Sequence, residues 1–203
     1  MRLYCRLLEE ANARLLCIEH GLNSQFNLPG PFLRELCFLQ LRMLCELIAL
    51  GCLTAHGDIG NAPVAKIKKE WHAGRIIAEL ETLHPDFYPV PITQEERAPG
   101  RFHMTERDPT FTKEDLFELY NKSGDVLHKG NIQKLLTANL PVQTNFPDVI
   151  KWARKIAGLL AIHGIALFGG QRLVCYLKAT NRGGYAHVAL ASPAPHGDPV
   201  ADA

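Results

Sequence analysis

The segment from residue 32 to residue 55 constrains the fold most, because apolar side chains cover it almost all round. A helix without a continuous polar face must be enclosed by other elements, as the central helix of a bundle is. Arg42 and Glu46 interrupt the segment and lie four residues apart, where they can pair. Such charges at the centre of a membrane span would be costly, so the pattern favours a buried helix of a soluble protein.

Four further stretches predict helices. Apolar residues recur every three to four positions over residues 2 to 22, 63 to 83 and 145 to 168. Thr112 followed by Asp115 has the cap-and-acid pattern of a helix start. The pattern places Trp71 on the inner face of its helix. It also places His163 on an inward face, where we interpret it as a hydrogen-bonded core residue.

Two other segments predict non-helical structure. The runs RLVCYLKA and YAHVALA alternate like strands, and TNRGG between them is a good hairpin connection. Residues 84 to 112 hold five prolines, so we expect a long connector without regular structure beyond short extended pieces, or a substrate lid. The expected fold class is therefore mainly α, an up-and-down helical bundle of four to five main helices with a C-terminal two-stranded β-hairpin. We expect one domain over residues 1–191, with the hairpin at 171–191 and a flexible tail at 192–203.

Composition narrows the function classes. A net charge of +1 provides no overall field for nucleic acid or membrane, so RNA binding would need a local basic patch. The N-terminus lacks the uninterrupted apolar stretch of a signal peptide, and the six cysteines form no CxxC pair. We therefore expect a cytoplasmic protein without membrane association. No common nucleotide, hydrolase or zinc motif occurs, so we expect no cofactor and no metal.

The segment from residue 116 to residue 131 is the candidate site. Within nine residues it presents groups that can bind a phosphate or move a proton: Tyr120, Lys122, Ser123, Asp125 and His128. Asp125 precedes His128 by three residues, so on a helix it could hold the imidazole in one tautomer. Lys122 would point about 120° away from His128 on a continuous helix. Convergence of the two would require a kink at Gly124, help from Arg42 across the bundle, or a second subunit.

This segment resembles the signature region of HEPN-type domains, whose pattern is an arginine, four to six residues, then a histidine. The candidate arginine positions hold Asn121, Lys122 and Ser123, and Lys122 alone keeps the charge. Tyr120, eight residues before the histidine, and the small residue Gly130 also look similar to divergent members. The resemblance implies a helical bundle that dimerises. It also implies metal-independent ribonuclease activity of the kind found in toxin, phage-defence and CRISPR systems.

The resemblance implies a role for each residue of the site. His128 would assist proton transfer at the ribose 2′-hydroxyl, Lys122 would neutralise the phosphate and Asp125 would orient the histidine. Tyr120, Ser123 and Arg42 are the candidate binding residues, RNA is the expected substrate or ligand, and a homodimer is the expected assembly. Lysine lacks the planar fork with which arginine grips a phosphate, so the site could instead be degenerate. The alternative is a non-enzymatic helical module in which the hairpin or an apolar bundle face binds a protein partner. In that case the same residues are a capped helix end with a hydrogen-bonded histidine.

Overall fold

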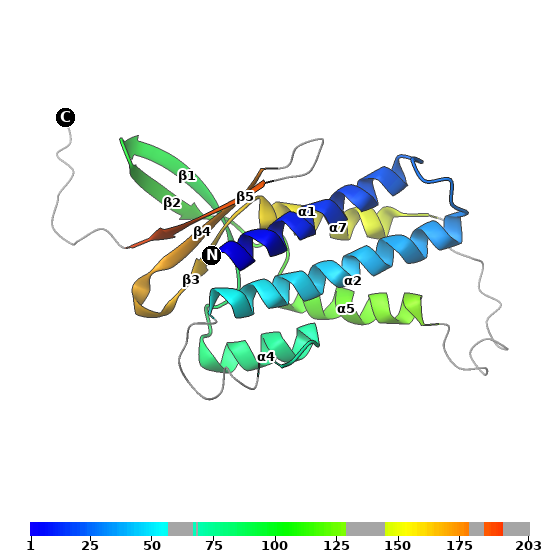
Figure 1. The fold of residues 1–203 in the computed structure, drawn as a ribbon, viewed down its shortest axis with the longest axis horizontal. Coiled ribbons are helices and arrows are strands. Elements are labelled where there is room, and N and C mark those ends of the chain that lie inside the picture. The colour runs from blue at the N-terminus through cyan, green and yellow to red at the C-terminus, as the bar shows by residue number, and fades with distance from the viewer. Residues whose placement is uncertain (57–66, 68, 129–144, 179–184, 193–203) are drawn as a thin grey trace.

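The computed structural model describes residues 1–56, 67, 69–128, 145–178 and 185–192. In this part of the chain the helices run along the long axis of the molecule, and the strands gather towards one end (Figure 1). The helices are α1 (Arg2–Leu22), α2 (Gly30–Ala55), α4 (Ala73–Leu83), α5 (Lys113–Leu127) and α7 (Pro147–Ala161). The strands are β1 (Val90–Ala98), β2 (Arg101–Glu106), β3 (Ile162–Ala166), β4 (Arg172–Lys178) and β5 (Tyr185–Ala191).

Helix α2 is the central helix, as its apolar surface predicts. The other four described helices all contact it, and Phe38, Leu41 and Leu44 on it are fully buried. Pro31 lies in its first turn, where the missing amide hydrogen costs nothing. Among the described helices, α2 is the one long and apolar enough to cross a membrane by length and composition, and 61% of its qualifying window is buried inside the structure. That burial is typical of a core helix.

The expectation of a mainly α bundle with a two-stranded hairpin is wrong. The predicted strands are present as β4 and β5, but they belong to a five-stranded antiparallel sheet in the order β2-β1-β3-β4-β5. Ile165, Leu173 and Cys175 of this sheet are buried in the same core as the helices. The fold is therefore mixed α/β. The hairpin connection at 179–184 and residues 193–203 of the predicted tail lie outside the described residues.

Strands β1 and β2 occupy the proline-rich segment that we expected to be a connector. They pair from Ile92↔Glu106 to Ala98↔Arg101, and Gly100 takes a positive φ of 74° in the turn. Most of their residues are exposed on both faces, so the alternation of apolar and polar residues that predicts a half-buried strand is absent. Backbone pairing with each other and with β3 decides their structure instead.

Strand β3 replaces the end of the helix expected over 145 to 168. Helix α7 ends at Ala161, and His163 in β3 pairs with Cys175 in β4. The inward position of His163 fits either a helix or a strand, and the neighbouring strand β4 selects the strand. His163 is fully buried and lies 2.7 Å through Nε2 from the Tyr4 hydroxyl of α1. Its interpretation as a hydrogen-bonded core residue is confirmed, although its element was wrong.

The helix expected over 63 to 83 is interrupted in the described residues, because Ile67 is helical and buried but residues 69–72 are not helical. Helix α4 starts at Ala73, and the Glu70 carboxylate accepts hydrogen bonds from the backbone N–H groups of Trp71 and His72 before it. Trp71 is 69% exposed, so its predicted place on the inner face is wrong. Residues 63–66 and 68 lie outside the described residues. Gly74 does permit a close helix contact, because a Cβ there would lie 2.9 Å from Phe117 of α5.

Candidate functional site

Helix α5 carries the candidate segment and is continuous from Lys113 to Leu127. It begins as predicted, with a capping box in which the side chains of Thr112 and Asp115 each accept the other's backbone N–H. His128 is the residue that ends it, and the His128 N–H still donates to the Gly124 carbonyl at 2.9 Å. There is therefore no kink at Gly124 to bring Lys122 and His128 together.

Lys122 is held by an acidic side chain on another helix. Its Nζ lies 3.3 Å from Oδ2 of Asp148, the first-turn acid of α7. Asp148 also accepts two hydrogen bonds, at 2.9 and 2.6 Å, from the guanidinium of buried Arg34. The hydrogen bonds from Arg34 are the main cause that lowers the pKa of Asp148 to about 2, with Lys122 adding to them. The charge of Lys122 is thus already compensated within the subunit.

The remaining predicted residues of α5 do not form a catalytic group with Lys122. His128 and Asp125 are exposed, and no hydrogen bond joins them among the contacts of the described residues. Ser123 is fully buried, and its hydroxyl donates to the Leu119 carbonyl one turn earlier at 2.7 Å. This bond is common for a serine inside a helix. Because Ser123 is fully buried, it has no accessible surface for a ligand.

Arg42 of α2 reaches the candidate segment instead. Its Nη2 donates to the Tyr120 hydroxyl at 2.7 Å, and its guanidinium carbon lies 4.0 Å from the centre of the Tyr120 ring. Its Nε lies 3.5 Å from Glu46, so the predicted pair on α2 is also present. Burial raises the pKa of Tyr120, which Arg42 opposes and Glu46 reinforces. Arg42 therefore both pairs with Glu46 on its own helix and reaches across the bundle to Tyr120 on α5.

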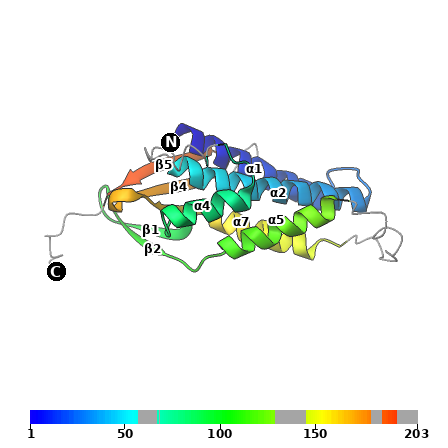
Figure 2. The same ribbon diagram turned by 90° about the horizontal axis from the view of Figure 1, so that it is seen from below.

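A histidine missed by the sequence analysis completes this group. The ring of His72, the residue before α4, lies 4.9 Å edge-on from the Tyr120 ring. Its Nδ1 atom is buried and has no hydrogen-bond partner among the described residues. We call Arg42, Glu46, Tyr120 and His72 the Arg42 cluster. Helices α2, α4 and α5, which carry or adjoin its members, lie side by side (Figure 2).

The sequence around His72 contains a second signal besides the apolar periodicity of the predicted helix. A lysine-rich run ends at Lys69, and Trp71 and His72 follow it after one acidic residue, Glu70. A basic run with adjoining aromatic residues is typical of nucleic-acid contacts. Because residues 63 to 83 were predicted to form one amphipathic helix, Trp71 and His72 were not identified as candidate site residues.

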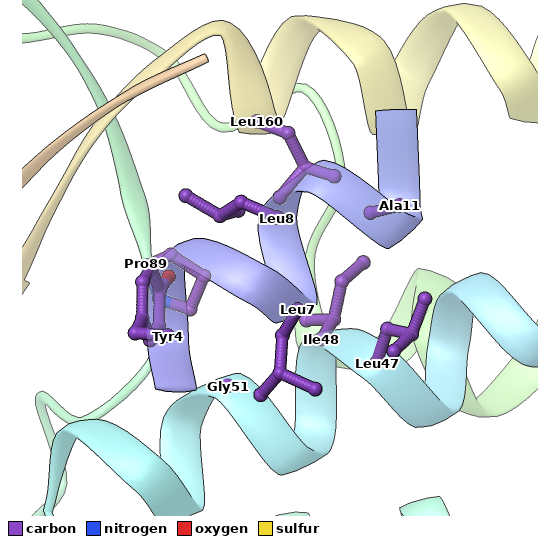
Figure 3. Close-up of a pocket in the computed structure, with 9 residues that line it drawn as sticks. All are labelled: Tyr4, Leu7, Leu8, Ala11, Leu47, Ile48, Gly51, Pro89 and Leu160. Atoms are coloured by element: carbon purple, nitrogen blue, oxygen red, sulfur yellow. The ribbon is translucent and has the colours of Figure 1, made fainter. Parts of the chain in front are cut away.

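Two hollows lie elsewhere. One is a cavity of about 10 Å³ where α1, α2 and α7 meet, and the side chains around it are apolar apart from the hydroxyl of Tyr4 (Figure 3). That is about the space of one water molecule, and apolar walls keep such a cavity dry. It is a packing gap and cannot hold a ligand.

The other hollow is a groove of about 500 Å³ beside the start of α5 and the β3–β4 part of the sheet. Its acidic members Asp86 and Glu114 are exposed, whereas its cations are paired. Lys113 pairs with Glu81, and Arg172 pairs with Glu106 at 2.5 Å. The groove therefore has no excess of positive charge that would attract a polyanion, and it is a poor candidate for binding RNA.

No family model, curated protein or solved structure matches this chain. Within the described ranges, no group of three or more histidine, cysteine or acidic side chains is placed to hold a metal ion. The Arg42 cluster brings together a guanidinium, a phenol and an imidazole, which are groups that bind phosphate and can move protons.

Proposed function

We propose that this protein is an RNA-binding protein of the HEPN-like type that contacts a backbone phosphate through the Arg42 cluster. The observation that carries the proposal is the position of Arg42. Its guanidinium lies on Tyr120 inside the segment that resembles the HEPN signature, and 23% of its side chain is exposed. It brings an arginine to a segment that contains none of its own.

The arginine has hydrogen-bonding capacity left for a ligand. A guanidinium has five N–H donors, and here Nη2 donates to the Tyr120 hydroxyl while Nε faces Glu46. The contact of Nη1 with the Tyr120 carbonyl is 3.5 Å long, at the limit of a hydrogen bond. Gly124 lets the guanidinium lie close to α5, because a Cβ there would be in van der Waals contact with Nη1 at 3.4 Å. The guanidinium therefore keeps N–H donors that a phosphate oxygen could accept.

Removing the guanidinium is expected to weaken RNA binding. We expect Arg42→Gln to raise the Kd for a single-stranded RNA about tenfold, the loss of one charge-assisted hydrogen bond. The slope of log K against log salt should fall by about 0.7, the value for one phosphate contact on a single strand. Fluorescence anisotropy of a labelled RNA at several salt concentrations measures both quantities.

Two further variants separate a specific contact from general charge and from misfolding. Arg42→Lys keeps the charge but loses the fork, so it should restore the salt slope and only part of the affinity. Arg97→Gln removes an exposed arginine of β1, paired with Glu95 at 3.7 Å, and should change little. Equal losses in the Arg42 and Arg97 variants would reduce the proposal to non-specific electrostatics. Thermal unfolding checks that each variant is folded.

We further propose that the ribonuclease centre is degenerate. Lys122 is compensated by Asp148, and no described side chain orients the imidazole of His128. We expect no RNA cleavage above background in the presence of EDTA, and unchanged RNA affinity in His128→Ala. Gel analysis of labelled RNA after long incubation measures cleavage. Metal-independent cleavage that vanishes in His128→Ala would contradict this and establish an active enzyme, with Lys122 supplied in another arrangement or by a second subunit.

We also propose that the protein is cytoplasmic, because its N-terminus lacks the pattern of a signal peptide. A homodimer and a role in defence or toxin–antitoxin systems are proposed on the resemblance to HEPN-type domains. The second candidate, a protein interaction module, is favoured by one observation. Phe32 and Leu39 lie seven residues apart on one side of α2 and are 58% and 42% exposed. The hairpin is a poor candidate for this surface, since Leu173 and Cys175 of its strand β4 are buried. A wild-type protein that forms a stable assembly but binds no RNA would favour the module.

A further inference from the structure

Trp71 is the most exposed large apolar side chain of the described residues, at 69%. Its position is nevertheless defined. The Glu70 carboxylate accepts the backbone N–H groups of Trp71 and His72 at 2.9 and 3.0 Å and faces Arg75 at 3.5 Å. These donors lower the pKa of Glu70, with the backbone of His72 the largest cause. The indole is therefore presented to solvent by an ordered helix start.

The indole begins a series of ring contacts that ends at the Arg42 cluster. Its ring lies 6.0 Å from the His72 ring, at an interplanar angle of 61°. His72 in turn meets the Tyr120 ring edge-on at 4.9 Å, and Arg42 covers Tyr120 at 4.0 Å. These contacts connect Trp71 with Arg42 through His72 and through the ring of Tyr120, which is 3% exposed.

Two cations flank Trp71 in the sequence. Lys69 is exposed, and the Arg75 side chain is 71% exposed. Glu70 is the one acid between residues 69 and 75, and its oxygens face backbone N–H groups and Arg75. A flat aromatic surface between exposed cations fits a flexible polyanion with flat groups. Single-stranded RNA has this chemistry, because its unpaired bases stack on aromatic side chains while its phosphates contact lysine and arginine.

We propose that Trp71 is a stacking platform for an unpaired RNA base, with Lys69 and Arg75 contacting the adjoining phosphates. This inference rests on the proposed function and names the form of RNA that the site accepts. A base-paired RNA offers its bases to the platform less readily, because they are stacked within the helix. The protein should therefore prefer a single strand to a duplex of equal length.

The test uses intrinsic fluorescence, since the chain has two tryptophans and Trp152 is 2% exposed in the core. Titration with an unstructured 12-nucleotide RNA should quench the emission of wild type, and the Trp71→Ala variant should show no quenching. In the anisotropy assay we expect Trp71→Ala to bind this RNA about tenfold more weakly. Trp71→Phe keeps an aromatic face and should recover most of the affinity. Phe102→Ala, which removes an exposed aromatic residue of β2, is the matched control and should bind as wild type does.

Further arms identify the ligand. The duplex should bind more weakly than the single strand, and a single-stranded DNA of the same sequence tests whether the 2′-hydroxyl contributes. The double variant Lys69→Gln/Arg75→Gln should lower the salt slope by about 1.4, the value for two phosphate contacts. Full affinity in Trp71→Ala, together with a loss in Arg42→Gln, would overturn the platform and leave the proposed function standing. A wild type that binds no RNA would overturn both. Quenching by anionic vesicles but not by RNA would assign the surface to a membrane instead.

Discussion

Replacing Asp148 by alanine is expected to lower the free energy of unfolding by about 3 kcal/mol. Arg34, on α2, is 7% exposed, and its guanidinium makes two hydrogen bonds to the Asp148 carboxylate. Without this partner the buried charge keeps a hydrogen bond to the Asn145 carbonyl at 2.8 Å and a contact with the Phe38 ring. A buried charge without its counter-ion is strongly destabilising, because neither water nor an anion solvates it. Urea unfolding at pH 7 measures the change.

Lys122 provides the matched control for this prediction. It contacts the same carboxylate, but 40% of its side chain is exposed, and such pairs contribute about 0–1 kcal/mol. Lys122→Ala should therefore change the free energy of unfolding by less than a third of the Asp148→Ala effect. Replacing Arg34 and Asp148 together by Met and Leu should recover much of the loss, since no buried charge remains. Equal effects of Lys122→Ala and Asp148→Ala would show that Arg34 is not the residue that depends on Asp148.

Acidification from pH 7.0 to pH 4.5 is expected to remove ~2 kcal/mol of stability through His163 alone. Burial lowers the pKa of His163 to about 4, and a backbone hydrogen bond with Leu160 only partly opposes it. The unfolded chain has the ordinary histidine pKa near 6.5, so between these two values the unfolded state binds a proton that the folded state does not. Stability is therefore complete above pH 6.5 and falls as the pH drops towards 4.

The hydroxyl of Tyr4 fits this neutral histidine. Burial raises the pKa of Tyr4, so its hydroxyl stays protonated, and it shares a hydrogen bond of 2.7 Å with Nε2 of the neutral imidazole. The variant His163→Gln keeps an acceptor for Tyr4 but cannot titrate. Its loss of stability between pH 7.0 and pH 4.5, measured by urea unfolding, should be smaller than that of wild type by ~2 kcal/mol. Identical pH profiles of the two proteins would contradict the assignment. The pKa of Asp148 is lowered to about 2, so its contribution is lost only below pH 3.8 and does not enter this window.

The candidate site was only partly predictable from the sequence. The segment of α5 and the reach of Arg42 towards it follow from helix periodicity, and the structure places Arg42 on Tyr120. The ion pair between Lys122 and Asp148 was not predictable from the sequence. Asp148 follows Lys122 by 26 positions and meets it only when α5 and α7 have packed on α2. Trp71 and His72 were assigned to a helix interior because their apolar spacing continues that of α4, whereas Glu70 accepts their backbone N–H groups and α4 begins after them, at Ala73. The resemblance to HEPN-type domains stays a prediction.

The sequence by itself determined the elements whose stabilising interactions are local. Helices α1 and α2 begin and end close to their predicted bounds, and α5 begins at its predicted cap, since caps, proline and apolar periodicity act within a few residues. Only the tertiary structure decided β1, β2 and β3, because a strand is completed by hydrogen bonds to partners distant in the chain. The same reason separates the two parts of the site. The apolar surface of α2 fixed where Arg42 would be, but the packing of α4 and α5 against that helix decided which tyrosine and which histidine it meets.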